Sequence, residues 1–250
     1  MTIATITLEH QSEELAAGAR SYIYRLLADS FSYPSDIFSE TLASGDWYGR
    51  FSALAQHLPF DLSCGEPSFA EPTTDALQQG YVSIFEVGTG RPYCPLYEGS
   101  HRSGRMKLME DLVRFYEYFG LRIQPGDHPD HLCAELEFMH YMAFKEAAAL
   151  AHADPVADVR RAQRDFLDRH LCRWLPRIRS RLQSARDLPS FYLFAAELAE
   201  DFCRRDIAWL KAAWGKPSPP GAGETGLTSD FTSSITVTRP KHEGDQASTG

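Results

Sequence analysis

Residues 127–142 read DHPDHLCAELEFMHYM, and this stretch decides how the chain folds around it. Proline is tolerated in or before the first turn of a helix, and aspartate is a favourable N-cap, so Pro129 and Asp130 predict a helix start. The apolar residues beyond them recur three and four positions apart, as one face of a helix requires. These residues are Leu132, Leu136, Met139 and Ala143. We therefore predict a long helix from about Asp130 to Leu150 with one face in a core.

The polar side chains of this helix divide between two faces. Residues two apart point about 200° around the helix axis, so Glu135 and Glu137 cannot share a face. Residues three or four apart do share one, which places Glu137 beside His140 and His131 beside Glu135.

The start of this helix is the first candidate binding site. Asp127, Asp130 and His131 cluster there. The first backbone N–H groups of a helix lack partners within the helix and favour carboxylates. We therefore expect the helix start to be a recognition site.

The remaining chain also shows helical periodicity. Apolar residues recur at helical spacing over 12–31, 36–42, 46–58, 74–85, 105–119, 154–174 and a last segment that starts near Asp187 or Ser190 and ends at Trp214. Pro176 should break or kink the helix that begins at Asp154, leaving 177–182 as a separate turn or a bent continuation. No segment shows strand alternation followed by a turn and a second such run. The sequence predicts an all-α fold.

The first of these helices has a predicted buried stripe of its own. Its members are Leu15, Ala19, Tyr22, Ile23, Leu26, Leu27 and Phe31. We divide the chain into a flexible N-terminus (1–11), a single globular helical domain (12–214) and a disordered tail (215–250). The tail is rich in proline, glycine, serine and threonine and poor in aromatic residues, so it lacks the means to form a core.

Composition restricts the classes of function. The net charge of −9 and the pI near 5.5 disfavour a nucleic-acid partner and suit a basic one. Five widely spaced cysteines without a Cys-x-x-Cys pair fit reduced thiols better than a disulfide framework or a zinc site. Neither an export signal nor a membrane-spanning segment is expected. These features predict a cytoplasmic protein.

The segment from Arg91 to Arg102 is the second candidate binding region. Its prolines and glycines exclude a regular helix over most of its length, yet it carries Tyr93, Tyr97, Glu98, His101 and Arg102. A loop with such side chains is suited to form one wall of a groove. The alternative is that the tyrosines fill the core while the charged groups face water.

An enzymatic interpretation rests on two Glu-x-x-His pairs, Glu98 with His101 and Glu137 with His140. In helical bundles such pairs place both ligands on one iron or manganese ion of a di-metal carboxylate oxidase. The first pair lies in a loop rich in glycine and proline, and the bridging glutamates of two further helices are not evident. The sequence therefore favours a binding protein over a metal oxidase.

Two motifs resemble a known family. They are Pro-Leu-Tyr-Glu-Gly-Ser at 95–100 and the acidic helix start at 130–139, and both resemble the TorD/DmsD/NarJ group of cytoplasmic chaperones that serve the maturation of molybdenum enzymes. The segments 22–34 and 166–176 are similar to the group as well, so the resemblance spans about residues 15–214. The Tyr-Glu form of the loop resembles chaperones of the dimethylsulfide, ethylbenzene, chlorate and selenate oxidoreductases.

The resemblance implies an all-helical, non-enzymatic chaperone without a cofactor of its own. Its partner would be a molybdoenzyme catalytic subunit, bound through its twin-arginine leader or as the apo-form until the cofactor is inserted, and the chaperone would be a monomer or a domain-swapped dimer. The family's leader-binding pocket maps onto Leu96, Tyr97, Ser100, Asp130 and His131.

The chemistry of such a leader adds three acidic residues to the expected site. A leader offers two guanidinium groups followed by an apolar run, so its receptor needs carboxylates beside an apolar groove. Glu98, Asp127 and Glu135 can supply carboxylates in addition to Asp130. We expect Asp130 and His131 to shape the groove floor, and Glu98 and Asp127 to meet the arginines.

Overall fold

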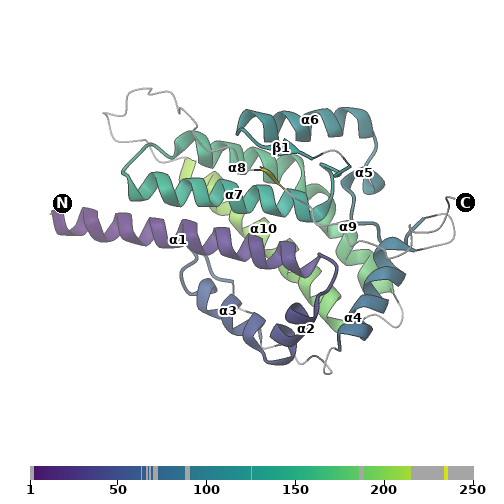
Figure 1. The fold of residues 1–250 in the computed structure, drawn as a ribbon. Helices are drawn as coiled ribbons and strands as arrows, with labels where there is room; N and C mark the ends of the chain where they lie inside the picture. The colour runs from purple at the N-terminus through teal and green to yellow at the C-terminus, as the bar shows by residue number, and fades with distance from the viewer. Residues whose placement is uncertain are drawn as a thin grey trace, which may run out of the picture.

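The computed structural model describes residues 3–62, 64–65, 67, 69, 73–87, 91–124, 126–185, 189–214 and 234–235. These residues form ten α-helices, one π-helical turn and two strands of two residues each (Figure 1). The predicted all-α class is confirmed.

The elements follow one another along the chain. Their bounds are α1 (Ile3–Ser30), α2 (Asp36–Ala43), α3 (Asp46–Ala55), α4 (Thr74–Tyr81), the π-helical turn η1 (Val82–Glu86), α5 (Glu98–His101), α6 (Arg105–Tyr118), β1 (Arg122–Ile123), α7 (Leu132–Ala151), α8 (Ala157–Arg169), α9 (Leu171–Ser184), α10 (Ser190–Trp214) and β2 (Ser234–Ile235). α1 begins at Ile3 rather than at Ser12. The predicted flexibility of 1–11 and disorder of 215–250 stay predictions. Within the tail, β2 pairs in parallel with β1, while 215–233 and 236–250 lie outside the described residues.

Helix α7 is the centre of the fold. It packs along α1 over most of its length, α2, α3 and α4 lie on one side of this pair, and α6 lies on the other (Figure 1). The four apolar residues predicted to form its buried face are all fully buried. Its polar side chains separate as predicted, because Glu135 reaches Trp174 on α9 whereas Glu137 lies 3.6 Å from Arg25 on α1.

The residue that caps α7 differs from the one expected. Asp130 is not the N-cap. His131 is, since its Nδ1 accepts a hydrogen bond of 3.2 Å from the backbone N–H of Cys133. The carboxylate of Asp130 turns instead toward the preceding loop, where it accepts from the backbone N–H of Gly99 at 3.1 Å.

The predicted break at Pro176 is wrong. α9 runs through this proline, and the chain leaves the helical path at His170, whose φ of −120° and ψ of −98° separate α8 from α9. A proline inside a helix removes one backbone N–H donor, and here the packing of α9 tolerates that loss. His170 is held by contacts from two other elements, which explains why the break falls there.

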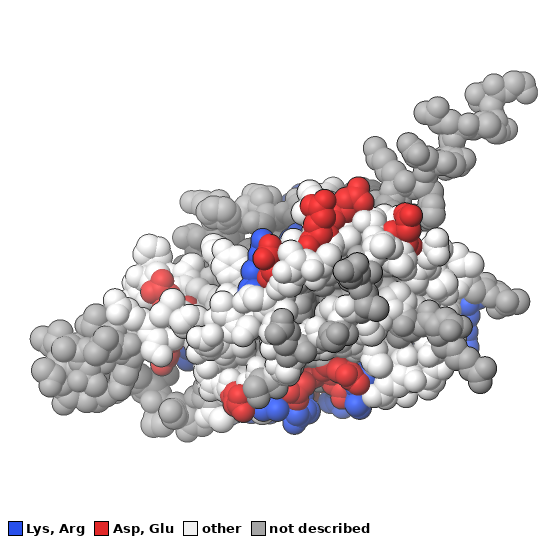
Figure 2. All heavy atoms as spheres, turned by 90° about the horizontal axis from the view of Figure 1, so that it is seen from below, with Lys and Arg blue, Asp and Glu red and all other residues white. Residues whose placement is uncertain are grey.

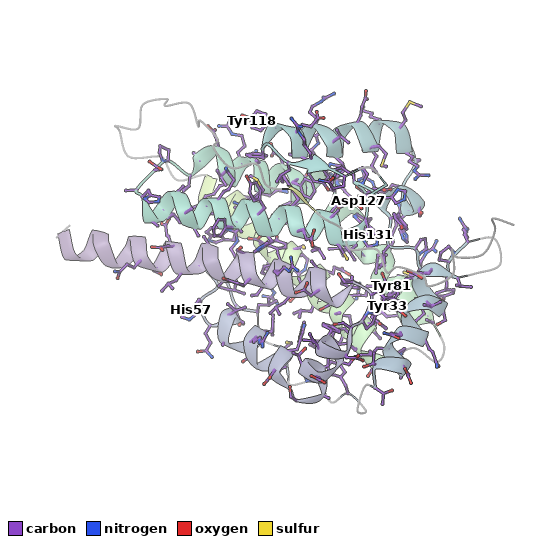
Figure 3. The ribbon with its side chains drawn as sticks, in the orientation of Figure 1. Tyr33, His57, Tyr81, Tyr118, Asp127 and His131 are labelled. Carbon is purple, nitrogen blue, oxygen red and sulfur yellow. The ribbon has the colours of Figure 1, made fainter. Side chains whose placement is uncertain are left out.

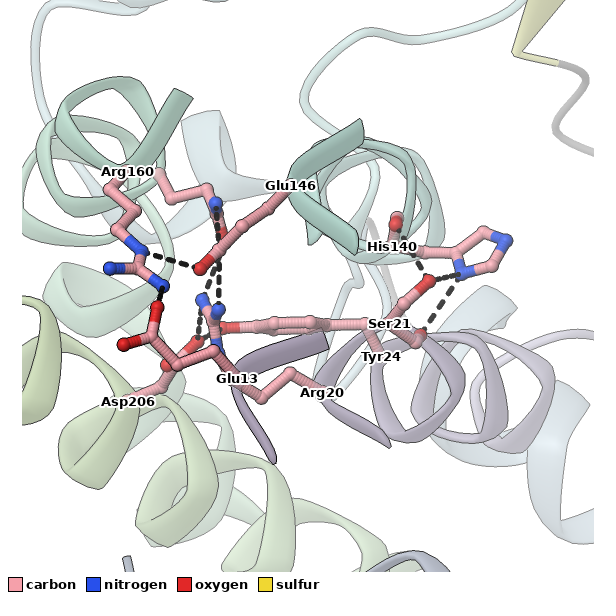
Figure 4. A network of polar contacts seen from close by, with 9 residues as sticks. Glu13, Arg20, Ser21, Tyr24, His140, Glu146, Arg160 and Asp206 are labelled. Carbon is pink, nitrogen blue, oxygen red and sulfur yellow. Dashed lines mark hydrogen bonds and ion pairs between the residues drawn. The ribbon is translucent and has the colours of Figure 1, made fainter. Parts of the chain in front are cut away.

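A buried ionic network joins four of the long helices (Figure 4). Arg20 of α1 is fully buried and bonds Glu146 of α7 at 2.7 Å and Asp206 of α10 at 2.6 Å. Arg160 of α8 bonds Glu146 at 2.6 Å, and the hydroxyl of Tyr24 donates to Asp206 at 2.6 Å. Each buried charge therefore has an opposite charge beside it.

This network corrects the predicted stripe of α1. Leu15 and Tyr22 were expected to be buried, but they are 56% and 62% exposed. Arg20 and Tyr24 are fully buried instead. The buried face of α1 therefore includes polar residues that the predicted stripe left out. Their burial is tolerated because they bond partners on other helices.

Candidate functional site

Backbone pairing brings the two predicted stretches together. Tyr97 and His131 form an isolated antiparallel bridge. The N–H of Glu98 donates to the carbonyl of Asp130 at 2.8 Å, and the N–H of Leu132 donates to the carbonyl of Leu96 at 2.9 Å. The loop before α5 and the start of α7 are therefore one structural unit, as a shared binding site requires.

Glu98 lies inside this unit and not on its surface. It is fully buried, its Oε2 lies 2.9 Å from Nδ1 of His170, and its Oε1 bonds Arg102. Nε2 of the same histidine lies 3.3 Å from the carboxylate of Asp111 on α6. Glu98 thus fixes α5 against α6 and the α8–α9 junction, and its charge is already matched within the protein.

Asp130 and Glu135 are also fully buried. A Cβ atom at Gly99 would lie only 2.9 Å from Oδ2 of Asp130, so this position needs glycine for the loop to approach α7. Glu135 accepts from the indole N–H of Trp174 at 3.1 Å. Burial and the nearby Glu98 carboxylate raise the pKa of Glu135 well above its usual range, which favours the protonated acid.

Three aromatic side chains surround the start of α7. The ring of Tyr97 meets those of His131 and His128 edge to face, with centroids 5.0 and 5.2 Å apart. Burial and the neighbouring His128 lower the pKa of His131 to about 4. His131 is therefore neutral near pH 7, which leaves its Nδ1 free to accept the bond that caps α7.

The predicted site residues differ in their access to solvent. Leu96 is buried, Tyr97 and Asp127 are partly exposed, and Ser100 is exposed. Figure 3 shows Asp127 and His131 at the same end of α7. Oδ2 of Asp127 is closed to solvent and has no hydrogen-bond partner among the described residues. A partner at the surface can reach Tyr97, Ser100 and the partly exposed His131, whereas it reaches Asp127 only through atoms other than Oδ2.

An acidic cluster extends this end of the molecule onto α1, and its member on α1 was not predicted from the sequence. Burial raises the pKa of Glu137 to about 7; Arg25 opposes this shift, and the carboxylates of Asp29 on α1 and Asp127 add to it by smaller amounts. Arg25 is the one cation in this group, at 3.1 Å from Asp29 and 3.6 Å from Glu137. We call Asp29, Asp127 and Glu137 the acidic cluster. Three carboxyl groups with one arginine leave room for another cation.

The two Glu-x-x-His pairs do not meet at a common point. His101 bonds the carbonyl of Pro95 at 2.7 Å, whereas His140 lies 2.8 Å from the hydroxyl of Ser21 on α1. Among the described residues, groups of three or more His, Cys, Asp or Glu arranged to hold a metal ion are absent. The residues of the di-metal alternative are thus engaged in separate structural contacts.

Comparison with known proteins identifies the family. The family model described as nitrate reductase delta subunit matches residues 46–180, more than half of the chain. The chain belongs to this family, the TorD/NarJ group that its motifs resemble. The matched residues 46–180 include both the loop before α5 and the start of α7.

Curated members of the TorD/NarJ family agree with this assignment. The chain is 37% identical over 176 residues to the selenate reductase assembly chaperone protein of Thauera selenatis. The aligned residues cover 69% of this chain and 78% of the relative. The chain is 33% identical over 201 residues to the perchlorate reductase assembly chaperone protein of Dechloromonas aromatica (strain RCB), covering 74% and 86%. The chaperone protein TorD of Vibrio parahaemolyticus serotype O3:K6 is 27% identical over 121 residues, covering 48% and 55%. The first two of these relatives are named as assembly chaperones of a reductase, and the third is named as a chaperone.

No helix among the described residues combines the length and the apolar character that are needed to cross a membrane.

Proposed function

We propose that the chain is a cytoplasmic assembly chaperone that binds the twin-arginine leader of a molybdenum-dependent oxidoreductase catalytic subunit before cofactor insertion and export. The observation that carries the proposal is the acidic cluster, whose three carboxyl groups have a single arginine among them beside the loop at 96–100. The chain acts by binding and supplies no catalytic step.

The leader's arginines match the acidic cluster. Guanidinium groups form paired hydrogen bonds with carboxylates, and such charge-assisted bonds contribute about 1.5–3 kcal/mol each. Asp127 is partly exposed, and its buried Oδ2 has no hydrogen-bond partner among the described residues, so a guanidinium group that gains access to this carboxylate supplies the missing donor. Two or three such contacts with modest apolar burial give an affinity near micromolar, or about −8 kcal/mol, which still permits release.

The site residues then fall into two roles. Tyr97, Ser100 and Asp127 contact the leader, since their side chains reach the surface. Leu96, Glu98, Asp130, His131 and Glu135 hold the loop and the start of α7 in register, through the backbone and side-chain bonds described above. This division replaces the expectation that Glu98 meets an arginine directly, because Glu98 is buried between His170 and Arg102.

The test is calorimetric titration of the protein with a synthetic twin-arginine leader peptide and with the same peptide carrying two lysines. Lysine keeps the charge but loses the paired geometry, so we expect weaker binding of the lysine peptide. Asp127→Asn should lower the affinity for the arginine peptide about tenfold.

Asp158→Asn on α8 is the matched control. It removes the same charge from a side chain that is 80% exposed and pairs loosely with Arg161 at 3.7 Å. Its affinity should equal that of the unaltered protein. Equal binding of both peptides, or equal affinities of the two variants, would reject the proposal.

A further inference from the structure

A cavity of about 260 Å³ opens between α1, α2 and α3. Its apolar lining comes from these helices and from the turn between α1 and α2, namely Leu26, Tyr33, Ile37, Phe38 and Trp47. Figure 2 views the molecule from the side of α2 and α3, where the charged side chains of the described residues gather toward the edges and leave the middle largely uncharged. A cavity of about 150 Å³ is enough for a benzene ring, so this one has room for a leucine or phenylalanine side chain.

One polar group in the lining lacks a partner. Trp47 is 3% exposed, and its indole N–H has no hydrogen-bond partner among the described residues. Two hydroxyl groups of the lining are already engaged, since Thr41 donates to the carbonyl of Phe38 at 2.8 Å and Ser32 donates to that of Ala28 at 3.1 Å. The N–H of Trp47 is closed to solvent, so Trp47 contributes its ring to the cavity as an apolar wall.

The cavity is continuous with the acidic cluster. Asp29 lines the cavity and belongs to the cluster, where Arg25 links it to Glu137. Ser32 also lines the cavity, and its hydroxyl lies 3.6 Å from the sulfur of Cys133 in the first turn of α7. The cavity therefore joins a carboxylate of the acidic cluster to apolar side chains, and its lining also includes the cation Arg50.

We propose that this cavity holds an apolar side chain of the segment that follows the arginine pair in the leader, packed against the ring of Trp47. The inference rests on the proposed function, and it adds a second subsite to the loop and the start of α7. The order of chemistry along the surface, acidic and then apolar, matches the order along the leader, cationic and then apolar.

The test is a double-mutant cycle between the cavity and the leader. Ile37 on α2 is 74% exposed, so Ile37→Ser changes the mouth of the cavity without emptying a core. Met106→Ser on α6 is the matched control, because Met106 is 87% exposed and lies outside the cavity lining. The probes are a synthetic twin-arginine leader peptide and the same peptide with the leucines of its apolar run changed to serine.

We expect Ile37→Ser to lower the affinity for the leader peptide roughly tenfold and Met106→Ser to leave this affinity unchanged. The serine peptide should bind the unaltered protein and Ile37→Ser equally, because the contact is then already lost.

Three results would overturn the inference. If Ile37→Ser and the serine peptide lower the affinity additively while binding still depends on the arginines, the cavity does not hold the leader's apolar segment. The proposed function would then still stand. A change in self-association on sedimentation with Ile37→Ser, without a change in leader affinity, means that a second copy covers the cavity. Failure of the unaltered protein to bind the leader peptide rejects both proposals.

Discussion

Two groups of charged residues along the α1–α7 pair differ in how their charges are matched. Around Arg20, the carboxylates of Glu146 and Asp206 face two arginines, and the group is closed from solvent (Figure 4). In the acidic cluster, Arg25 is the single cation, and its side chain is 48% exposed.

The pKa values follow this contrast at Glu146 and Glu137 and depart from it at Asp206. The two arginines around Glu146 lower its pKa even though it is buried, whereas burial raises the pKa of Asp206 despite its bond to Arg20. Burial, with smaller contributions from Asp29 and Asp127, raises the pKa of Glu137 to about 7 although Arg25 opposes the shift, so Arg25 does not fully offset the cost of burying this charge. A matched network stabilises the fold, whereas an unmatched one gains free energy when a cation binds. The difference between them separates scaffold from binding surface.

The largest effect should come from breaking the matched network. Arg20→Met leaves the carboxylates of Glu146 and Asp206 buried with fewer partners, and we expect the free energy of unfolding to fall by about 3–5 kcal/mol. Arg25→Met on the same helix is the control and should change it by less than about 1 kcal/mol, because its pairs are exposed to solvent. Urea denaturation measures both. Equal losses would show that the two groups do not differ as scaffold and surface.

A smaller loss is expected at Glu98, which belongs with the matched group. Glu98→Gln keeps the shape but removes the charge that faces His170 and Arg102, and should lower the free energy of unfolding by about 1–3 kcal/mol. The folded variant should still bind the leader peptide more tightly than Asp127→Asn does. Exposed Glu110 on α6 supplies the control Glu110→Gln, with unchanged stability. Unchanged stability with lost leader binding would instead make Glu98 a direct contact.

The sequence predicted the parts of this site that depend on local spacing. The apolar period placed the buried face of α7 correctly, and the motifs at 95–100 and 130–139 proved to be joined by backbone hydrogen bonds. The N-cap was wrong by one residue, because Asp130 is drawn toward Gly99 and leaves the cap to His131. A bond to a loop 31 positions earlier is not visible in local spacing.

What the sequence could not predict depends on distant partners. Arg20 can be buried because it pairs with Glu146 and Asp206. These partners lie 126 and 186 positions away in the chain. Periodicity alone would place an arginine in water, so the predicted stripe of α1 included Tyr22 in its place. The acidic cluster was missed for the same reason, since Asp29 meets Glu137 only through the packing of α1 on α7.

The unmatched group makes a final prediction about pH. The pKa of Glu137 is about 7 in the folded protein against an ordinary value of 4.5, so between these values the folded state binds the proton more tightly than the unfolded state. The stabilisation from its protonated form is therefore complete below about pH 4.5 and is lost as the pH rises to about 7. Glu137→Gln is uncharged at every pH.

We expect Glu137→Gln to match the unaltered protein in stability near pH 4.5 and to exceed it by about 1–3 kcal/mol at pH 8. Leader binding should show the opposite sign, because a guanidinium group favours the ionised form. The affinity of the unaltered protein should rise from pH 5 to pH 8, and that of Glu137→Gln should stay flatter. Urea denaturation and peptide titration at both pH values measure the two differences. A stability difference that does not change with pH would mean that Glu137 is already compensated by Arg25, and the acidic cluster would then have no unmatched charge to offer.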